Sequence, residues 1–284
     1  MKNSEQFIKC TEDDNLRRVI KFHEYFSRQY DLLERIEKGF LEINERERMG
    51  GLYPLLNSVM SGAISTDILV QKGLLTEAYI TARAFLERIT NLCYLLVCGE
   101  TEYQDFIEYS QQKVVRSLIS RQKAYSLIGH EIAIPKPPEL HQKMKAMMKK
   151  FEKPSGKEKG SWTVLTIEKR MEYVGTTVSS FRTQGYLAIK EYLYADASES
   201  IHGTLYGAMF HTGILYGLKG DKAVGEKYLH GLRANLYMML GLLIEALCKV
   251  VGDRLGGRNI GEEAEENFEV IGKALGMKKA QPNH

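Results

Sequence analysis

The sequence contains little proline and few stretches of strand-like alternation. Only six of its 284 residues are proline, and no alternation of apolar and polar residues persists for the length of a half-buried strand. Apolar residues instead recur every three to four positions through most of the chain, as they do on one face of a helix. The sequence therefore predicts an all-α multi-helix bundle.

The sequence also has no C-x-x-C pair, and we expect no secretory signal in its first residues. The four cysteines form no C-x-x-C pair, and three of them lie in apolar stretches, so we expect reduced core residues of a cytoplasmic protein. The first fifteen residues contain no apolar signal core. The most apolar run, 236–251, is interrupted by Glu245 and Lys249 and is short for a bilayer. We interpret this run as a buried helix and expect no membrane partner.

Changes in composition divide the chain into three expected parts. An amphipathic N-terminal helical extension, 1–50, precedes a helical core, 51–256, which carries a basic insertion at 135–162. A C-terminal helix and a flexible tail are expected over 257–284. Because the extension has an apolar face of its own, it is a candidate surface for a homodimer or for a partner protein.

The expected helices are separated by glycines and short polar breaks. Pro54 suits the first turn of a helix, and the glycines of ERERMGG suit the end of the helix before it. Short connections favour antiparallel packing of neighbouring helices. Helices are predicted over residues 14–48 (one or two), 54–70, 74–97, 102–128, 140–151, 166–173, 181–210 (two), 223–251 and 262–275.

The chain also lacks a strong excess of charge of either sign. Its 39 basic and 36 acidic residues give a net charge of +3, which does not by itself require a polyanionic partner. One local cluster, 136–159, holds eight lysines, including Lys149 and Lys150, against three glutamates. We interpret it either as a solvated connection or as a contact surface for a nucleic acid backbone. Phe151 and Trp162 are the nearby aromatic residues, too few to predict base stacking.

A line of polar residues crosses an otherwise apolar predicted helix. Arg83, Glu87 and Asn91 are four residues apart in succession and therefore share one helix face. We call these three residues the Arg83 stripe. Buried charges need partners, so we expect this stripe to meet polar groups of another helix, either as a structural network or as one wall of a functional site.

A second line with the same spacing lies in YADASESIHGTLYG. Ser198, His202 and Tyr206, the His202 stripe, are also four residues apart, and glycines beside them permit close approach by another helix or by a substrate. Histidine shuttles protons near neutral pH, and Arg83 is suited to stabilise a developing anion. A functional site requires Arg83, Glu87 and His202 to converge on a solvent-reachable pocket, whereas a purely structural histidine does not.

Recognised cofactor and metal motifs are missing. Glu199 and His202 spell E-x-x-H, half of the di-metal pattern of helical bundles, but the chain has no second E-x-x-H. The Gly-Lys of KPSGKEKGS has the wrong spacing for a phosphate loop, and the glycines of GDRLGGRNIG follow a predicted helix. We therefore expect no cofactor and no metal, with a di-metal oxidase as a minor alternative.

Three short motifs follow one another in a recognisable order. They are ARAFLERITNLCYL, a single tryptophan ahead of TIEKRMEYVG, and ASESIHG. In these motifs residues 55–215 resemble a bacterial family catalogued as a domain of unknown function, a resemblance that implies no particular activity. The residues that carry it are Arg83, Glu87, Trp162, Gly175, Ser198 and His202.

ASESIHG also resembles, more distantly, the R-N-x-x-x-H motif of the HEPN superfamily of helical bundles. Ser198 takes the place of the asparagine, and His202 and Gly203 fit the rest, whereas Ala197 stands where the catalytic arginine belongs. The resemblance implies a HEPN-like bundle of bacterial defence or stress response. It further implies either a metal-independent ribonuclease or a degenerate relative that binds RNA or a nucleotide.

The HEPN resemblance also implies roles for individual residues. His202 is the expected general acid and base, Arg83 the phosphate stabiliser in place of the missing arginine, and Glu87 the group that orients one of them. The expected supporting and substrate-binding residues are Ser198, Asn91, Tyr206, Arg182, Lys149 and Lys150. The alternative function is a non-enzymatic interaction module, in which the two stripes fix helix register and the N-terminal helices bind a partner.

Overall fold

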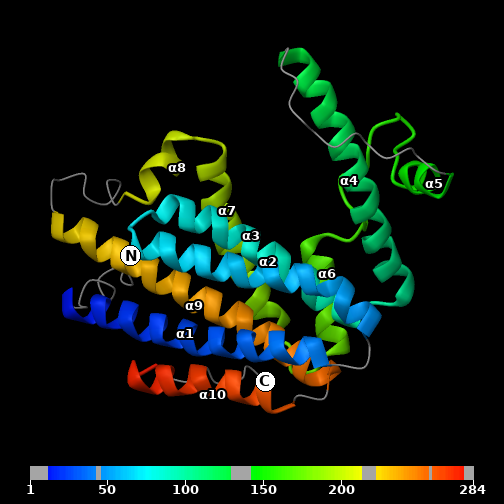
Figure 1. Cartoon of the computed structure of the whole chain (residues 1–284). Helices are drawn as coiled ribbons and strands as arrows, with labels where there is room; N and C mark the ends of the chain where they lie inside the picture. The colour runs from blue at the N-terminus through cyan, green and yellow to red at the C-terminus, as the bar shows by residue number, and fades with distance from the viewer. Residues whose placement is uncertain (1–11, 43–45, 129–141, 213–221, 256–257, 278–284) are drawn as a thin grey trace. The chain divides into compact units, whose positions relative to one another are not determined.

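The computed structural model describes residues 12–42, 46–128, 142–212, 222–255 and 258–277. Within these ranges every regular secondary-structure element is a helix, and the one β-bridge, between Glu152 and Glu158, is isolated (Figure 1). The prediction of an all-α multi-helix bundle is therefore confirmed.

Contacts divide the chain into two compact units. The main unit comprises residues 1–97 and 167–284, and the second unit comprises residues 98–166. The helices of the main unit are α1 (Glu12–Glu42), α2 (Arg46–Gln71), α3 (Leu75–Val97), α6 (Ile167–Thr177), α7 (Thr183–Ile201), α8 (Leu205–Phe210), α9 (Lys222–Arg254) and α10 (Arg258–Ala274). Those of the second unit are α4 (Glu100–Ile128) and α5 (Gln142–Lys150).

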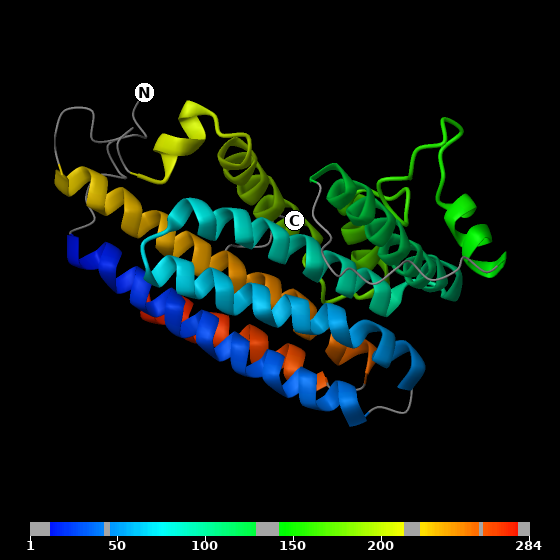
Figure 2. The same cartoon turned by 45° about the horizontal axis from the view of Figure 1, so that its top comes forward.

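Helix α9 is the centre of the main unit. It packs against α1, α3 and α10, and α1, α9 and α10 run side by side in both Figure 1 and Figure 2. By length and composition α9 would suffice to cross a membrane, but 78% of its most apolar window is buried inside the unit. The N-terminal helical segment expected before residue 50 is present, and its helix α1 lies along α9 and α10.

The start of α2 differs from the sequence prediction. The predicted helix end at the glycines of ERERMGG and the predicted start at Pro54 are both wrong, because α2 begins at Arg46 and contains Pro54. Proline inside a helix removes one backbone hydrogen bond. Leu52 and Leu56 on either side of it are fully buried, and their burial offsets that loss.

Two helices lie within 181–210, as predicted, but the break between them falls inside YADASESIHGTLYG, which the sequence interpretation places on a single helix. Helix α7 ends at Ile201 with His202 as its C-cap, and Gly203 then takes a φ of 62°. That conformation suits glycine because it has no Cβ. Thr204 caps the next helix by accepting a hydrogen bond from the Gly207 amide, 3.0 Å away.

The second unit is held together by aromatic and polar contacts between α4 and the segment that follows α5. The rings of Tyr109 and Phe151 meet edge to face at 5.2 Å, and Phe151 is buried. Arg116 of α4 donates a hydrogen bond of 2.8 Å to the Met148 carbonyl of α5. Of the basic insertion expected at 135–162, residues 135–141 lie outside the described part of the chain.

Candidate functional site

The Arg83 stripe faces α7, as the sequence predicts. The guanidinium of Arg83 donates a hydrogen bond of 2.9 Å from Nη1 to Oγ of Ser198, and its Nε lies 3.5 Å from Glu87 Oε1. The two stripes therefore meet at Arg83 and Ser198. The Arg83 side chain is about a quarter exposed, so this contact lies at the edge of the α3–α7 interface.

Tyr194 of α7 is a member of this site that the sequence analysis missed. The Arg83 guanidinium lies 4.2 Å above the centre of the Tyr194 ring, a cation–π geometry, and the Tyr194 hydroxyl donates to Glu87. Burial, with the neighbouring Glu87 carboxylate, raises the pKa of Tyr194. The signal was available, because Tyr194 precedes Ser198 by one helical turn.

Arg170 of α6 is the second missed member. Its Nη1 donates to the amide oxygen of Asn91, so a third helix contacts the Arg83 stripe. Burial lowers the pKa of Arg170, although its guanidinium remains a cation at neutral pH. We call the whole group the polar cluster; its members are Arg83, Glu87, Asn91, Arg170, Tyr194 and Ser198.

His202 and Tyr206 do not complete the cluster. The chain leaves the helix at His202, so Ser198, His202 and Tyr206 do not form one helical stripe, and this part of the sequence interpretation is wrong. His202 is exposed, and Tyr206 lies on α8 with 47% of its surface exposed. Among the described contacts, no side-chain hydrogen bond or ion pair joins His202 to the polar cluster.

A different histidine is buried in this region. His211 is 5% exposed, its ring centre lies 4.5 Å from that of Tyr79, and its Nδ1 is 3.5 Å from Ser200 Oγ. Burial lowers the pKa of His211 to about 4. Burial also raises the pKa of Asp196, one turn before Ser200 on α7, to about 6. Burial therefore shifts the pKa values of these two groups in opposite directions, because it disfavours the charged form of each.

Metal ligands do not gather in the described part of the chain. No group of three His, Cys, Asp or Glu side chains in these ranges is arranged to hold a metal ion. The Glu199 carboxylate of the E-x-x-H motif instead accepts a hydrogen bond of 2.8 Å from the Thr204 hydroxyl. Glu199 therefore supports the turn between α7 and α8.

Arg182 contacts α10, and the two predicted lysines belong to the second unit. Arg182 is the N-cap residue of α7 and pairs with Glu265 of α10. Lys150 belongs to the second unit, where its ammonium group lies 2.6 Å from both Asp105 and Glu108 of α4. These carboxylates raise the pKa of Lys150 and hold the end of α5 against α4.

Five further lysines of the second unit differ from Lys150 and from Lys113, which pairs with Glu158. They are exposed, and none of them forms an ion pair within the described residues. We call the stretch that carries them, residues 142–159, the lysine-rich segment. Its unpaired members are Lys143, Lys145, Lys149, Lys153 and Lys157. Two of these, Lys153 and Lys157, lie at either end of a tight turn in which the Lys153 amide donates to the Lys157 carbonyl at 2.7 Å.

Comparison with known proteins gives one match. The family model "Family of unknown function (DUF5677)" matches residues 49–214, more than half of the chain. No curated protein and no solved structure matches. The chain therefore belongs to the DUF5677 family, as the resemblance to a domain of unknown function implied. The matched range contains most of α2 and all of α3 to α8, and therefore both the polar cluster and the lysine-rich segment.

Proposed function

We propose that this DUF5677 protein binds RNA, and that the lysine-rich segment contacts the phosphate backbone. The observation that carries the proposal is the set of five exposed lysines in residues 142–159 that form no ion pair with any residue the structure describes. Clustered lysines release condensed counterions from a nucleic acid, which favours binding without any base-specific contact.

The ion pairs around this segment support the proposal. Lys150 and Lys113 are neutralised by carboxylates of the same unit, Lys113 by Glu158 at 2.9 Å. These two lysines fix the segment to α4, while their unpaired neighbours remain available to an anionic partner. A merely solvated connection needs no such anchoring of its ends to a helix.

The geometry favours binding over cleavage. In the HEPN-like hypothesis, His202 and Arg83 act on the same phosphate. Arg83 is already satisfied by Glu87, Ser198 and the Tyr194 ring, and His202 is exposed at the end of α7. We therefore propose that the polar cluster fixes the register of α3, α6 and α7, and that RNA binding belongs to the second unit.

Fluorescence anisotropy with a labelled single-stranded RNA tests this proposal. The triple variant Lys149→Gln/Lys153→Gln/Lys157→Gln is expected to weaken binding about tenfold or more, because three phosphate contacts are lost. The matched control replaces three exposed lysines of the main unit, Lys38→Gln/Lys72→Gln/Lys273→Gln, and is expected to bind like the wild type.

The outcome that contradicts the proposal is equal weakening in both triple variants, or none in either. The same samples, incubated with RNA without metal, address cleavage. We expect intact RNA with the wild type and with His202→Ala. Cleavage that disappears in His202→Ala would support the ribonuclease alternative over simple binding.

A further inference from the structure

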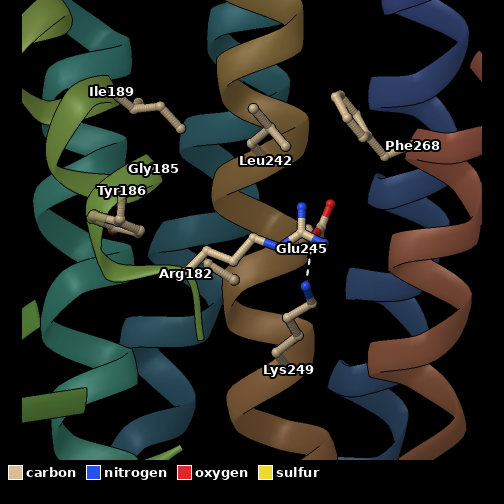
Figure 3. Close-up of a pocket in the computed structure, with 9 residues that line it drawn as sticks. Arg182, Gly185, Tyr186, Ile189, Leu242, Glu245, Lys249 and Phe268 are labelled. Atoms are coloured by element: carbon tan, nitrogen blue, oxygen red, sulfur yellow. Dashed lines mark ion pairs between the residues drawn. The ribbon is translucent and has the colours of Figure 1, made fainter. Parts of the chain in front are cut away.

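A pocket of about 210 Å³ opens between α7, α9 and α10 of the main unit. Figure 3 shows its walls, with Tyr186 and Ile189 on α7, Leu242 on α9 and Phe268 on α10. The Tyr186 hydroxyl forms a hydrogen bond of 3.0 Å with the Thr90 hydroxyl, so Tyr186 contributes its aromatic ring to the pocket. Most of the pocket lining is hydrophobic.

A buried ion pair forms one side of this pocket. Glu245 and Lys249 of α9 are 4% and 6% exposed, and Lys249 Nζ lies 2.8 Å from Glu245 Oε1 (Figure 3). Glu245 also accepts a hydrogen bond of 3.1 Å from the buried Tyr25 hydroxyl. Burying an ion pair costs desolvation free energy that the attraction between the two charges often does not recover. A buried ion pair beside a pocket therefore suggests a role in binding a ligand.

The carboxylate of Glu265, on α10, bridges two cations beside the pocket. Arg182 donates to its Oε1, and Lys249 Nζ lies 3.3 Å from its Oε2. Arg182 and Lys249 both line the pocket, whereas Glu265 does not. The pair Arg182 and Lys249, which we call the cation clamp, thus already holds a carboxylate, one oxygen to each cation.

We propose that the pocket binds a small monocarboxylic acid with an apolar body. The acid's carboxylate takes the place of Glu265 in the cation clamp, and its apolar part lies against Tyr186, Ile189 and Phe268. A space of about 210 Å³ is somewhat larger than the cavity of roughly 150 Å³ that holds benzene in another protein, which suits a short aryl or alkyl chain.

The charges around the cation clamp favour a ligand with a single negative charge. Lys249 has three N–H donors, and the described contacts use two of them, for Glu245 and Glu265. A monoanion that replaces Glu265 keeps the balance of two cations and two anions. A dianion would add a charge beside the buried Glu245, and an amine would face Arg182, so both are disfavoured.

Isothermal titration calorimetry with 3-phenylpropanoate tests the proposal. Glu265→Gln removes the internal competitor, so the acid should bind about three to ten times more tightly than it binds the wild type. Arg182→Gln should weaken binding about threefold to fivefold, because this exposed cation is partly screened. The neutral 3-phenylpropanamide should show no saturable binding.

The matched control is Glu263→Gln. Glu263 lies on α10, like Glu265, and forms a similarly exposed ion pair with Arg35 of α1. It should leave the affinity for the acid unchanged. The proposal is overturned if the acid does not bind at all, if the amide binds as well as the acid, or if Glu265→Gln binds no more tightly than Glu263→Gln. Lys249 is not replaced, because its loss would leave Glu245 buried without its cation. RNA binding depends on other residues, so the failure of one proposal would leave the other standing.

Discussion

At the scale of single residues, Arg83 joins several members of the polar cluster. Its guanidinium contacts a hydroxyl, a carboxylate and an aromatic ring at the same time. Planar guanidinium groups suit such combined contacts better than an ammonium group does. Arg83 therefore links α3 to α7 by directional contacts in addition to apolar packing.

A double-mutant cycle measures this link. Arg83→Met, Ser198→Ala and the double variant are unfolded in urea, and the coupling free energy between the two sites should be about 1 kcal/mol, since Arg83 is only partly exposed. The matched pair Lys169 and Glu172, also on one unit but largely exposed, should give about 0–0.5 kcal/mol. A coupling at Arg83 and Ser198 no larger than that of the exposed pair would contradict the structural role.

Asp196 and His211 predict a second effect at this scale, through their opposite pKa shifts. The pKa of Asp196 is raised from 3.8 to about 6, so between those values the folded state holds more protons there than the unfolded state, and its stability contribution falls as pH rises. The pKa of His211 is lowered from 6.5 to about 4, so its contribution rises with pH. In the wild type the two contributions partly cancel between pH 4 and pH 6.

Replacing each group alone should reveal this cancellation. From pH 4 to pH 6, the free energy of unfolding of Asp196→Asn should rise relative to the wild type, by about 1 kcal/mol after screening of this half-buried group. That of His211→Gln should fall relative to the wild type over the same range. Urea titrations at several pH values measure both, and parallel profiles of the three proteins would refute the opposed shifts.

The polar cluster illustrates how far sequence reasoning reaches at this scale. The spacing of Arg83, Glu87 and Asn91 predicts a shared helix face, and the meeting of Arg83 with Ser198 confirms that the face meets α7. Arg170 carries no local signal, because only the packing of α6 on α3 brings it to Asn91. Tertiary neighbours of this kind follow from helix arrangement, which periodicity alone does not determine.

At the scale of elements, the close approach of α1 and α9 depends on a single glycine. A Cβ on Gly241 of α9 would overlap the ring of Tyr25 of α1. Tyr25 is fully buried, and its hydroxyl is held by Glu245, so the ring has little room to move. The packing of the two longest helices of the main unit is therefore sensitive to one methyl group.

Gly241→Ala should lower the free energy of unfolding by about 1–3 kcal/mol, because the core at this point is already filled. A Cβ on Gly231, ten residues earlier on the same helix, would meet no heavy atom of the described residues within 4 Å, its chain neighbours and its own helix backbone aside. Gly231→Ala should therefore raise stability by about 0.5–1 kcal/mol through helix propensity. Denaturant unfolding measures both, and changes of the same sign would contradict this account of α1–α9 packing.

Helix limits show which local signals are decisive. The sequence analysis did not place a helix end at Gly203, where the backbone takes a φ of 62°. The spacing of Ser198, His202 and Tyr206 suggested one continuous stripe, because spacing alone does not locate a helix end. At Pro54 the sequence analysis instead predicted a helix start where the helix is continuous. Burial of the neighbouring leucines outweighs the lost hydrogen bond there.

At the scale of the whole molecule, the chain divides its chemistry between two units. The main unit holds the polar cluster and the pocket lined by Arg182 and Lys249, whereas the second unit holds the lysine-rich segment. The net charge of +3 conceals this segment. A sum of charges counts a lysine that pairs with a carboxylate and an unpaired lysine in the same way. Ion-pair geometry, which the sequence does not contain, distinguishes the two kinds.

The salt dependence of RNA binding tests the central proposal most directly. For the wild type, the logarithm of the association constant should fall linearly with the logarithm of the salt concentration. In Lys149→Gln/Lys153→Gln/Lys157→Gln the magnitude of that slope should decrease by about 2, since each lost contact to single-stranded RNA removes roughly 0.7. A slope identical to that of the wild type, or no RNA binding by the wild type at low salt, would contradict the account.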